Sequence, residues 1–255
     1  MPDDTKGIAA VTNGFLRKAY FSAKLHADDH HRRRKEKKDM KNYNKKKLRA
    51  ALAFLAAFVL WTAVLCLVDV QPVGQQGTSV GLAGMNRYFH DLTGVHMSLY
   101  TATDWLSLIP AGFVGGFAVL GLVQWIQRKS LLRVDRSILC LGGFYGVVLA
   151  AYLFFEVVPI NYRPILIEGR LEASYPSSTT VLVLCVMVTA MMQLRGRIQK
   201  RGFRQVTLVL LAAFSAFMVV GRLVSGVHWL SDIIGGALLS IGLVLLYASF
   251  AEPDN

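Results

Sequence analysis

The most informative stretch of the chain lies near the C-terminus, between two apolar runs, and reads GRLVSGVHWLSD over residues 221–232. It places Arg222, His228 and Asp232 beside segments that are apolar enough to enter a membrane. Polar and charged groups in such a position are costly unless they pair with one another or face water and a ligand. The stretch therefore predicts a functional site at a membrane face, between two membrane-spanning helices.

The spacing of these three residues suits phosphate chemistry. If the last helix begins near Ser231, His228 and Asp232 lie one turn apart, and the carboxylate accepts from one imidazole nitrogen. The other nitrogen is then free to attack or to exchange a proton. Arg222 would supply a planar, two-pronged donor for a phosphate. A histidine and an aspartate paired for structural reasons alone are the alternative that this motif leaves open.

Composition decides the surroundings of this motif. Apolar residues make up 54% of the 255-residue chain and charged residues only 17%. The apolar residues are gathered into six blocks long enough to span a bilayer, near 50–68, 105–126, 138–158, 179–194, 206–220 and 233–250. The fourth and fifth blocks are short at their polar ends, as expected if those ends form a site. We predict an all-α integral membrane protein, built as a six-helix transmembrane bundle.

The basic residues orient this bundle. Of the 28 lysines and arginines, fifteen lie at or before Arg49, four lie within 128–136 and five within 195–204. By the positive-inside rule, the first group and both short loops are cytoplasmic, and an even number of spans returns the C-terminus to the same side. We predict a cytoplasmic segment over 1–48, a transmembrane domain over 49–250 and a cytoplasmic tail over 251–255. The site-like segments 156–180 and 221–232 then face outward.

The net charge of +12 is concentrated in residues 32–49, next to the first span. Basic clusters beside a membrane helix attract anionic lipid headgroups. We therefore expect anionic lipid, and no nucleic acid, as the partner of this segment. The absence of an early, short apolar block argues against a signal peptide, and we expect a multi-pass protein of the bacterial plasma membrane.

The outward loop before the fourth span carries a second group of candidate residues. Arg163 is one of only four basic residues on the outward side, and the loop ends in PSSTT over residues 176–180. This ending predicts a helix N-terminus, with Pro176 at or just before the first turn and hydroxyl groups capping free amides. Such N-termini bind phosphate. An ordinary helix cap is the alternative.

Taken together, these motifs resemble those of the type 2 phosphatidic acid phosphatase superfamily. Tyr162-Arg163-Pro164, Pro176-Ser177 and Arg222-x5-His228-x3-Asp232 follow one another as the family's three motifs do. The family consists of six-helix membrane lipid phosphatases in the fold shared with vanadium haloperoxidases, and the resemblance covers residues 105–250. It implies that His228 is the nucleophile that forms a phosphohistidine and that Asp232 orients it. It further implies that Arg163, Ser177 and Arg222 hold the phosphoryl oxygens, and that neither a metal nor another cofactor is required.

The chain departs from the family pattern at three positions. Glu156 stands where the family has a lysine, Thr179 where it has the histidine that protonates the leaving group, and Gly221 where it has a serine. Loss of a general acid costs a factor of about 10² to 10⁴ when an alkoxide must leave. A phosphate leaves without much help because its second pKa is about 6. We therefore predict an outward-facing lipid phosphatase that prefers a lipid diphosphate of the polyprenyl diphosphate type.

Two further interpretations remain open from the sequence. Glu168 and Glu172 would supply the missing acid if desolvation raised their pKa values, and otherwise are solvated loop charges. A catalytically silent lipid-phosphate-binding or transport-related protein with the same fold would explain both missing residues at once.

The first outward loop, 69–104, has no metal-ligand spacing, and its residues 81–100 are predicted to lie along the membrane surface as a helix. Trp229 is predicted to be an interfacial anchor.

Overall fold

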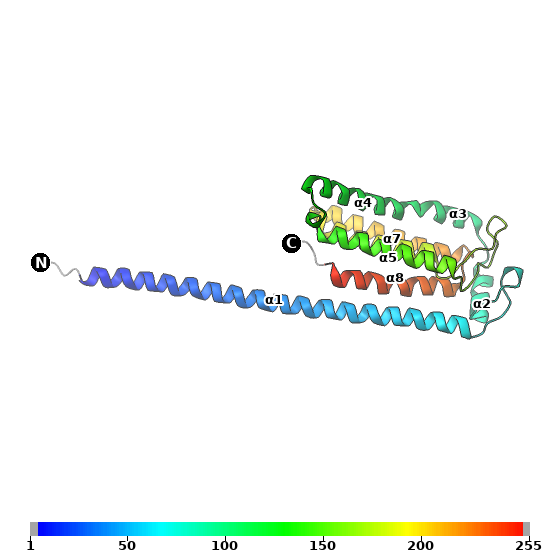
Figure 1. Cartoon of the computed structure of the whole chain (residues 1–255), viewed down its shortest axis with the longest axis horizontal. Helices are drawn as coiled ribbons and strands as arrows, with labels where there is room; N and C mark the ends of the chain where they lie inside the picture. Colours follow the sequence, from blue (N-terminus) through cyan, green and yellow to red (C-terminus); the bar gives the residue numbers. More distant parts are fainter. Residues whose placement is uncertain (1–4, 252–255) are drawn as a thin grey trace. The chain divides into compact units, whose positions relative to one another are not determined.

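The structure is a computed structural model that describes residues 5–251, with side chains described at Asp29 and from Arg32 onward. All regular elements within these residues are helices (Figure 1). The chain divides after Lys46 into two units, which are considered separately below. Of the predicted C-terminal tail, only Ala251 lies within the described residues.

The first unit, up to Lys46, is helical from Thr5 onward and forms the first part of helix α1 (Thr5–Leu67). All side chains from Arg32 to Met40 are exposed, the basic ones included. Asp29 pairs with Arg32 at 2.9 Å and with Arg33 at 2.8 Å, one turn further along the helix. The basic segment is therefore a helix in which most positive charges remain available to a partner.

The second unit contains the six predicted membrane spans. Within residues 47–251, the spans are the second part of α1, the pair α3 (Met97–Leu106) and α4 (Leu108–Arg128), α5 (Arg136–Val157), α6 (Ser178–Arg197), α7 (Arg201–Val224) and α8 (Leu230–Phe250). All six are long and apolar enough to cross a membrane. The predicted all-α, six-helix bundle is thus confirmed. The prediction of a short fifth span was wrong, because α7 continues through Arg222 to Val224.

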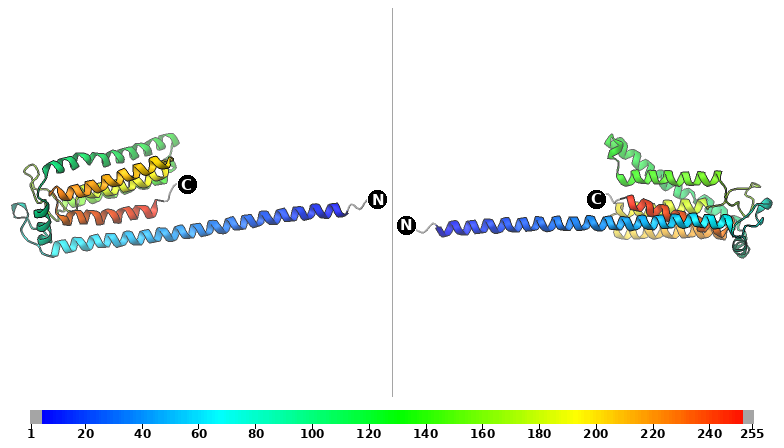
Figure 2. Two further views of the ribbon diagram at one scale, coloured as in Figure 1. Left: turned by 180° about the vertical axis from the view of Figure 1, so that it is seen from behind. Right: turned by 60° about the horizontal axis from the view of Figure 1, so that its bottom comes forward.

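Helices α6 and α8 form the centre of this unit. Figure 2 shows α8 (red) alongside α7 (orange). In α6 and α8, 56% of the most apolar window is buried, compared with 11–28% in the other spans. Helix α6 packs against α4, α5, α7 and α8. The central position of these two helices matters for the site, because α6 begins directly after Ser177 and α8 begins within the third motif, at Leu230.

The segment 69–104, predicted to face outward, does not form the single surface helix predicted for residues 81–100. It forms α2 (Ala83–Thr93) and α3, and α3 leads into α4 after Ser107. Helix α3 packs against α7 so closely that a Cβ atom on Gly221 would lie 2.9 Å from Cγ2 of Thr103. This contact gives a physical reason for glycine at the position where the family pattern has serine.

The loop between α5 and α6 folds back on itself. Tyr162 and Ala173 form an antiparallel bridge, and the backbone N–H of Arg163 donates to Glu172 O at 3.0 Å. Tyr175 fixes the end of the loop: its ring stacks on Phe58, and α8 crosses it at Gly235, where a Cβ atom would lie 2.4 Å from the ring. The loop and the start of α6 are therefore held against α1 and α8.

Candidate active site

The three motifs meet at one end of the bundle, where two hydrogen bonds join them. The indole Nε1 of Trp229 donates to Tyr162 O at 2.8 Å, and the backbone N–H of Ser177 donates to Asp232 O at 3.1 Å. Trp229 is only 4% exposed. Its prediction as an interfacial anchor was wrong, because its ring is used to connect the first and third motifs.

His228 and Asp232 lie next to each other, as their spacing predicts. Helix α8 begins at Leu230, and Nδ1 of His228 is 3.7 Å from Oδ2 of Asp232. This distance is longer than a hydrogen bond. The same Oδ2 atom accepts from the backbone N–H of Trp229 at 2.9 Å. The aspartate therefore caps the start of α8, and a small movement of the imidazole would bring it into hydrogen-bonding range.

The burial of His228 controls its charge. The residue is 3% exposed and lies in the segment between α7 and α8. Burial lowers the pKa of its imidazole to about 4; Asp232 partly offsets this shift, and the charges of Arg163 and Arg222 add to it. At neutral pH the ring is uncharged, which is the state in which an imidazole nitrogen has a free lone pair.

Each of the two arginines is buried and has a carboxylate beside it. Nη2 of Arg222 is 3.2 Å from Oδ1 of Asp104 and also donates to the hydroxyl of Thr179. Nε of Arg163 is 3.0 Å from Oε2 of Glu172, although the N–H group does not point at that oxygen. Arg163 is 8% exposed and Arg222 is 2% exposed.

An aromatic ring from the first outward loop lies beside both guanidinium groups. Cζ of Arg222 is 4.9 Å from the centre of the Tyr100 ring, and Cζ of Arg163 is 5.9 Å from it. Both distances are within cation–π range. Tyr100 and Asp104 lie one turn apart on α3. Their i, i+4 spacing was the sequence signal that would have placed them together, but nothing in the sequence connected them to Arg222.

Several buried nitrogen atoms of the site have no hydrogen-bond partner among the described residues. They are Nε and Nη1 of Arg163, Nε and Nη1 of Arg222, and both ring nitrogens of His228. Buried polar groups in folded proteins are nearly always paired. Such a concentration of unpaired nitrogen atoms, contributed by three different segments, is what a binding site for an oxygen-rich anion requires.

Ser177 occupies the N-cap position of α6, but its side chain does not cap the helix. Its hydroxyl instead accepts from the hydroxyl of Thr180 at 3.1 Å. The predicted capping by hydroxyl groups was therefore wrong for Ser177. Pro176 precedes the helix rather than opening its first turn.

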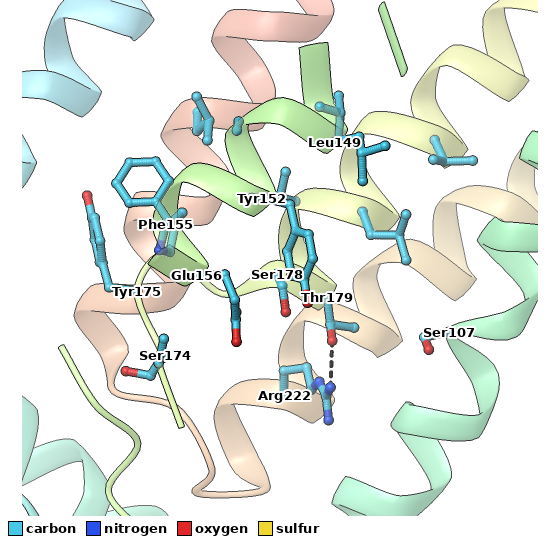
Figure 3. Close-up of a pocket in the computed structure, with 18 of the residues that line it drawn as sticks. Ser107, Leu149, Tyr152, Phe155, Glu156, Ser174, Tyr175, Ser178, Thr179 and Arg222 are labelled. Carbon is cyan, nitrogen blue, oxygen red and sulfur yellow. Dashed lines mark hydrogen bonds between the residues drawn. The ribbon is translucent and has the colours of Figure 1, made fainter. Parts of the chain in front are cut away.

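A cavity of about 660 Å³ opens beside the arginines (Figure 3). Its wall includes Arg163, Arg222, Asp104 and Glu156, together with apolar residues of α4, α5 and α6. His228 is not part of this wall. The cavity thus leads to the arginine pair, and the buried His228 lies outside its wall.

The two loop carboxylates considered as acids differ in their surroundings. Glu172 lies against Arg163, whereas Glu168 is exposed in a turn closed by hydrogen bonds between Ile167 and Arg170. Among the described residues, no group of three or more His, Cys, Asp or Glu side chains is placed to hold a metal ion.

Comparison with known proteins bears on this geometry. Residues 143–254 match the model of the PAP2 superfamily. This match agrees with the resemblance stated from the three motifs, all of which lie within the matched residues. The fold is similar to a crystal structure described as the first transmembrane PAP2 type phosphatidylglycerolphosphate phosphatase from Bacillus subtilis, at 14% identity and a TM-score of 0.53. The similarity covers 78% of this chain and 93% of that one.

No curated protein matches the chain. The PAP2 fold and the six apolar helices together identify a multi-pass membrane protein.

Proposed function

We propose that this protein is a membrane lipid phosphatase that acts at the outer face through a phosphohistidine at His228. One observation carries the proposal: six buried nitrogen atoms of Arg163, Arg222 and His228 have no hydrogen-bond partner among the described residues, and they belong to three segments joined at one site. A phosphoryl group offers several acceptor oxygens to such donors. Arg163 and Arg222 would bind these oxygens, with the N-terminus of α6 at Ser177 as a further phosphate-binding element.

The proposed reaction begins with the neutral imidazole. Because Nδ1 faces Asp232, Nε2 is the nitrogen that attacks phosphorus, and the bond from phosphorus to the leaving oxygen breaks. Asp232 stabilises the positive charge that develops on the ring. Water then attacks the phosphorus of the phosphohistidine, the P–N bond breaks, and inorganic phosphate leaves. The first step requires that Nε2 of His228 comes within bonding reach of the phosphorus atom of a phosphate bound by the arginines.

The residue at position 179 favours a particular leaving group. The Thr179 hydroxyl accepts from Arg222 and is far too weak an acid to protonate an alkoxide efficiently. A phosphate leaving group needs no such acid. We therefore propose a lipid diphosphate, of the polyprenyl diphosphate type, as a better substrate than a phosphate monoester such as phosphatidate. We also propose that the basic segment, residues 32–49, lies on the cytoplasmic side of the membrane and contacts anionic lipid headgroups.

Phosphate release by the purified protein in detergent tests the proposal. His228→Ala should reduce release from a polyprenyl diphosphate by roughly 10³-fold or more, because it removes the nucleophile. His96→Ala is the matched control, because His96 is exposed and its ring forms a hydrogen bond with the backbone oxygen of Thr93. Faster release from phosphatidate than from the diphosphate would overturn the substrate preference, and full activity of His228→Ala would overturn the mechanism.

A second function is favoured by the absence of His228 from the residues that form the cavity wall. If the histidine does not reach a bound phosphate, the protein binds lipid phosphates without turnover, as a silent binder or a transport-related protein would. Binding of vanadate or of the lipid, with no phosphate release from any lipid monophosphate or diphosphate, would support this second function over the first.

A further inference from the structure

We propose that the cavity beside the arginine pair also binds an ammonium group, so that the site accepts, besides the proposed lipid diphosphate, a lipid phosphate whose headgroup carries its own positive charge. This inference rests on the proposed function in one respect only: the arginines hold the phosphate. It adds a second subsite, formed by Asp104 and Glu156 with aromatic side chains of α5.

The first argument is the balance of charge. Two guanidinium groups, of Arg163 and Arg222, face three carboxylates, of Asp104, Glu156 and Glu172. A site built only for a multiply charged anion would have more positive than negative groups, because carboxylates close to a bound anion repel it. A ligand that places an ammonium group near the carboxylates offsets the repulsion between these carboxylates and its phosphate group.

The second argument is the unusual place of Glu156. It lies in the last turn of α5 and on the cavity wall, and Figure 3 shows Glu156, Ser178 and Arg222 reaching into the same space from α5, α6 and α7. No salt bridge joins Glu156 to another residue of the described range, whereas Asp104 and Glu172 each have an arginine. Glu156 is therefore the carboxylate whose charge the protein itself leaves uncompensated.

The third argument concerns the kind of cation. Tyr152 lies one turn before Glu156 on the same cavity wall, and Phe155 is also part of it. Aromatic faces together with a carboxylate are typical of sites for organic ammonium groups. A divalent metal ion would require several carboxylates or histidines around one point, and the described residues contain no such group.

The buried, unpaired arginine nitrogens fix the other end of the ligand. Arg163 and Arg222 line the cavity and each has two nitrogen atoms without a partner in the described part of the chain. A phosphate bound there would direct the rest of the headgroup along the cavity, whose wall contains Glu156. The ligand class that fits both ends is a zwitterionic headgroup, with phosphate and ammonium separated by a short linker.

Two soluble probes that differ in a single charge test this inference. Phosphoethanolamine and ethyl phosphate carry the same phosphate group, but only the first has an ammonium group. Titration calorimetry with the purified protein in detergent should give a Kd for phosphoethanolamine that is roughly three- to tenfold lower, as expected for an ion pair at a partly exposed carboxylate with aromatic neighbours.

Variants of Glu156 sharpen the test. Glu156→Gln should abolish the preference and leave ethyl phosphate binding within about twofold, because the removed charge only faces the ammonium group. Glu156→Lys should reverse the preference by strengthening ethyl phosphate binding. Glu168→Gln is the matched control, since Glu168 is exposed and not part of the cavity wall. It should retain the wild-type preference.

The outcomes separate this inference from the proposed function. Equal affinity for the two probes in the wild type, or an unchanged preference in Glu156→Gln, would overturn the ammonium subsite while leaving phosphate release by His228 unaffected. Conversely, a preference that depends on Glu156 in a protein without turnover would support the subsite and contradict the phosphatase proposal. Failure of both probes to bind would contradict the subsite.

Discussion

The two sides of the candidate site are built differently. The motif side consists of Ser177, His228, Trp229 and Asp232, all of which are no more than 4% exposed. Hydrogen bonds connect Asp232 to Ser177 and to Trp229. The carboxylate side consists of Asp104, Glu156 and Glu172, all of which are partly or largely exposed. The comparison teaches that the residues expected to perform chemistry are fixed by packing. The residues expected to select the ligand are held by little more than charge.

A substitution within the motif side should have the largest effect. Gly226 has a φ of +69°, and a Cβ atom there would lie 2.0 Å from the carbonyl oxygen of Gly94. Gly226→Ala should therefore destabilise the protein by at least about 3 kcal/mol, since both the backbone conformation and the contact become unfavourable. Thermal unfolding in detergent measures the effect.

Gly143→Ala is the control for that substitution. Gly143 lies within α5, and a Cβ atom there would meet nothing within 4 Å. It should leave the melting temperature unchanged or raise it slightly, because alanine favours a helix over glycine. Equal melting temperatures for the two variants would show that the segment between α7 and α8 is not held as tightly as its contacts indicate.

Acid should weaken the motif side through His228. Its pKa is about 4 in the folded protein and 6.5 as the ordinary value, so the unfolded chain binds a proton that the folded protein does not between these limits. The contribution of His228 to stability is complete above pH 6.5 and decreases as the pH falls toward 4, by about 3 kcal/mol in total.

The pH dependence of thermal unfolding in wild type and in His228→Asn checks this expectation. The asparagine variant cannot take up a proton at this position, so the difference in melting temperature between the two proteins should change between pH 6.5 and 4. A constant difference over this range would mean that His228 titrates normally and is not buried as described.

The arginine that faces both sides should show a smaller, purely functional effect. Arg222→Lys keeps the positive charge but removes the fork that can bind two phosphoryl oxygens. We expect kcat/KM for phosphate release to fall about 100-fold. Arg170→Lys, an exposed change in the loop between α5 and α6, should leave it unchanged. Equal rates for the two variants would remove Arg222 from the phosphate-binding set.

The smallest effect is expected on the carboxylate side. Asp104 lies 3.2 Å from Arg222 and its side chain is 56% exposed, so the pair is well screened by solvent. Asp104→Asn should strengthen the inhibition of phosphate release by vanadate about threefold, because the arginine is then free for the anion. Asp91→Asn, an exposed change on α2, should not alter inhibition. Weaker inhibition in Asp104→Asn would indicate that Asp104 positions Arg222 rather than competing for it.

Some features of the site followed from short-range patterns. The four-residue spacing of His228 and Asp232 across the start of a helix is local, and it correctly placed the two side chains next to each other. The hydrogen bond expected between them is not formed, because the two atoms are 3.7 Å apart. The partners of Trp229 and Ser177 could not be inferred in this way. Trp229 donates to Tyr162, 67 residues away, and such a contact exists only after two loops have packed together. An exposed interfacial ring and a buried connecting ring have the same sequence signal.

The sequence by itself determined six membrane spans, the position of the last helix start and the family to which the three motifs point, because apolar block length and residue spacing are properties of contiguous chain. Only the tertiary structure decided which carboxylates lie beside the arginines. Asp104 is 118 residues away from Arg222, and α3 brings it there by packing on α7. The burial that keeps His228 neutral was likewise decided by packing, since desolvation depends on every neighbouring segment at once.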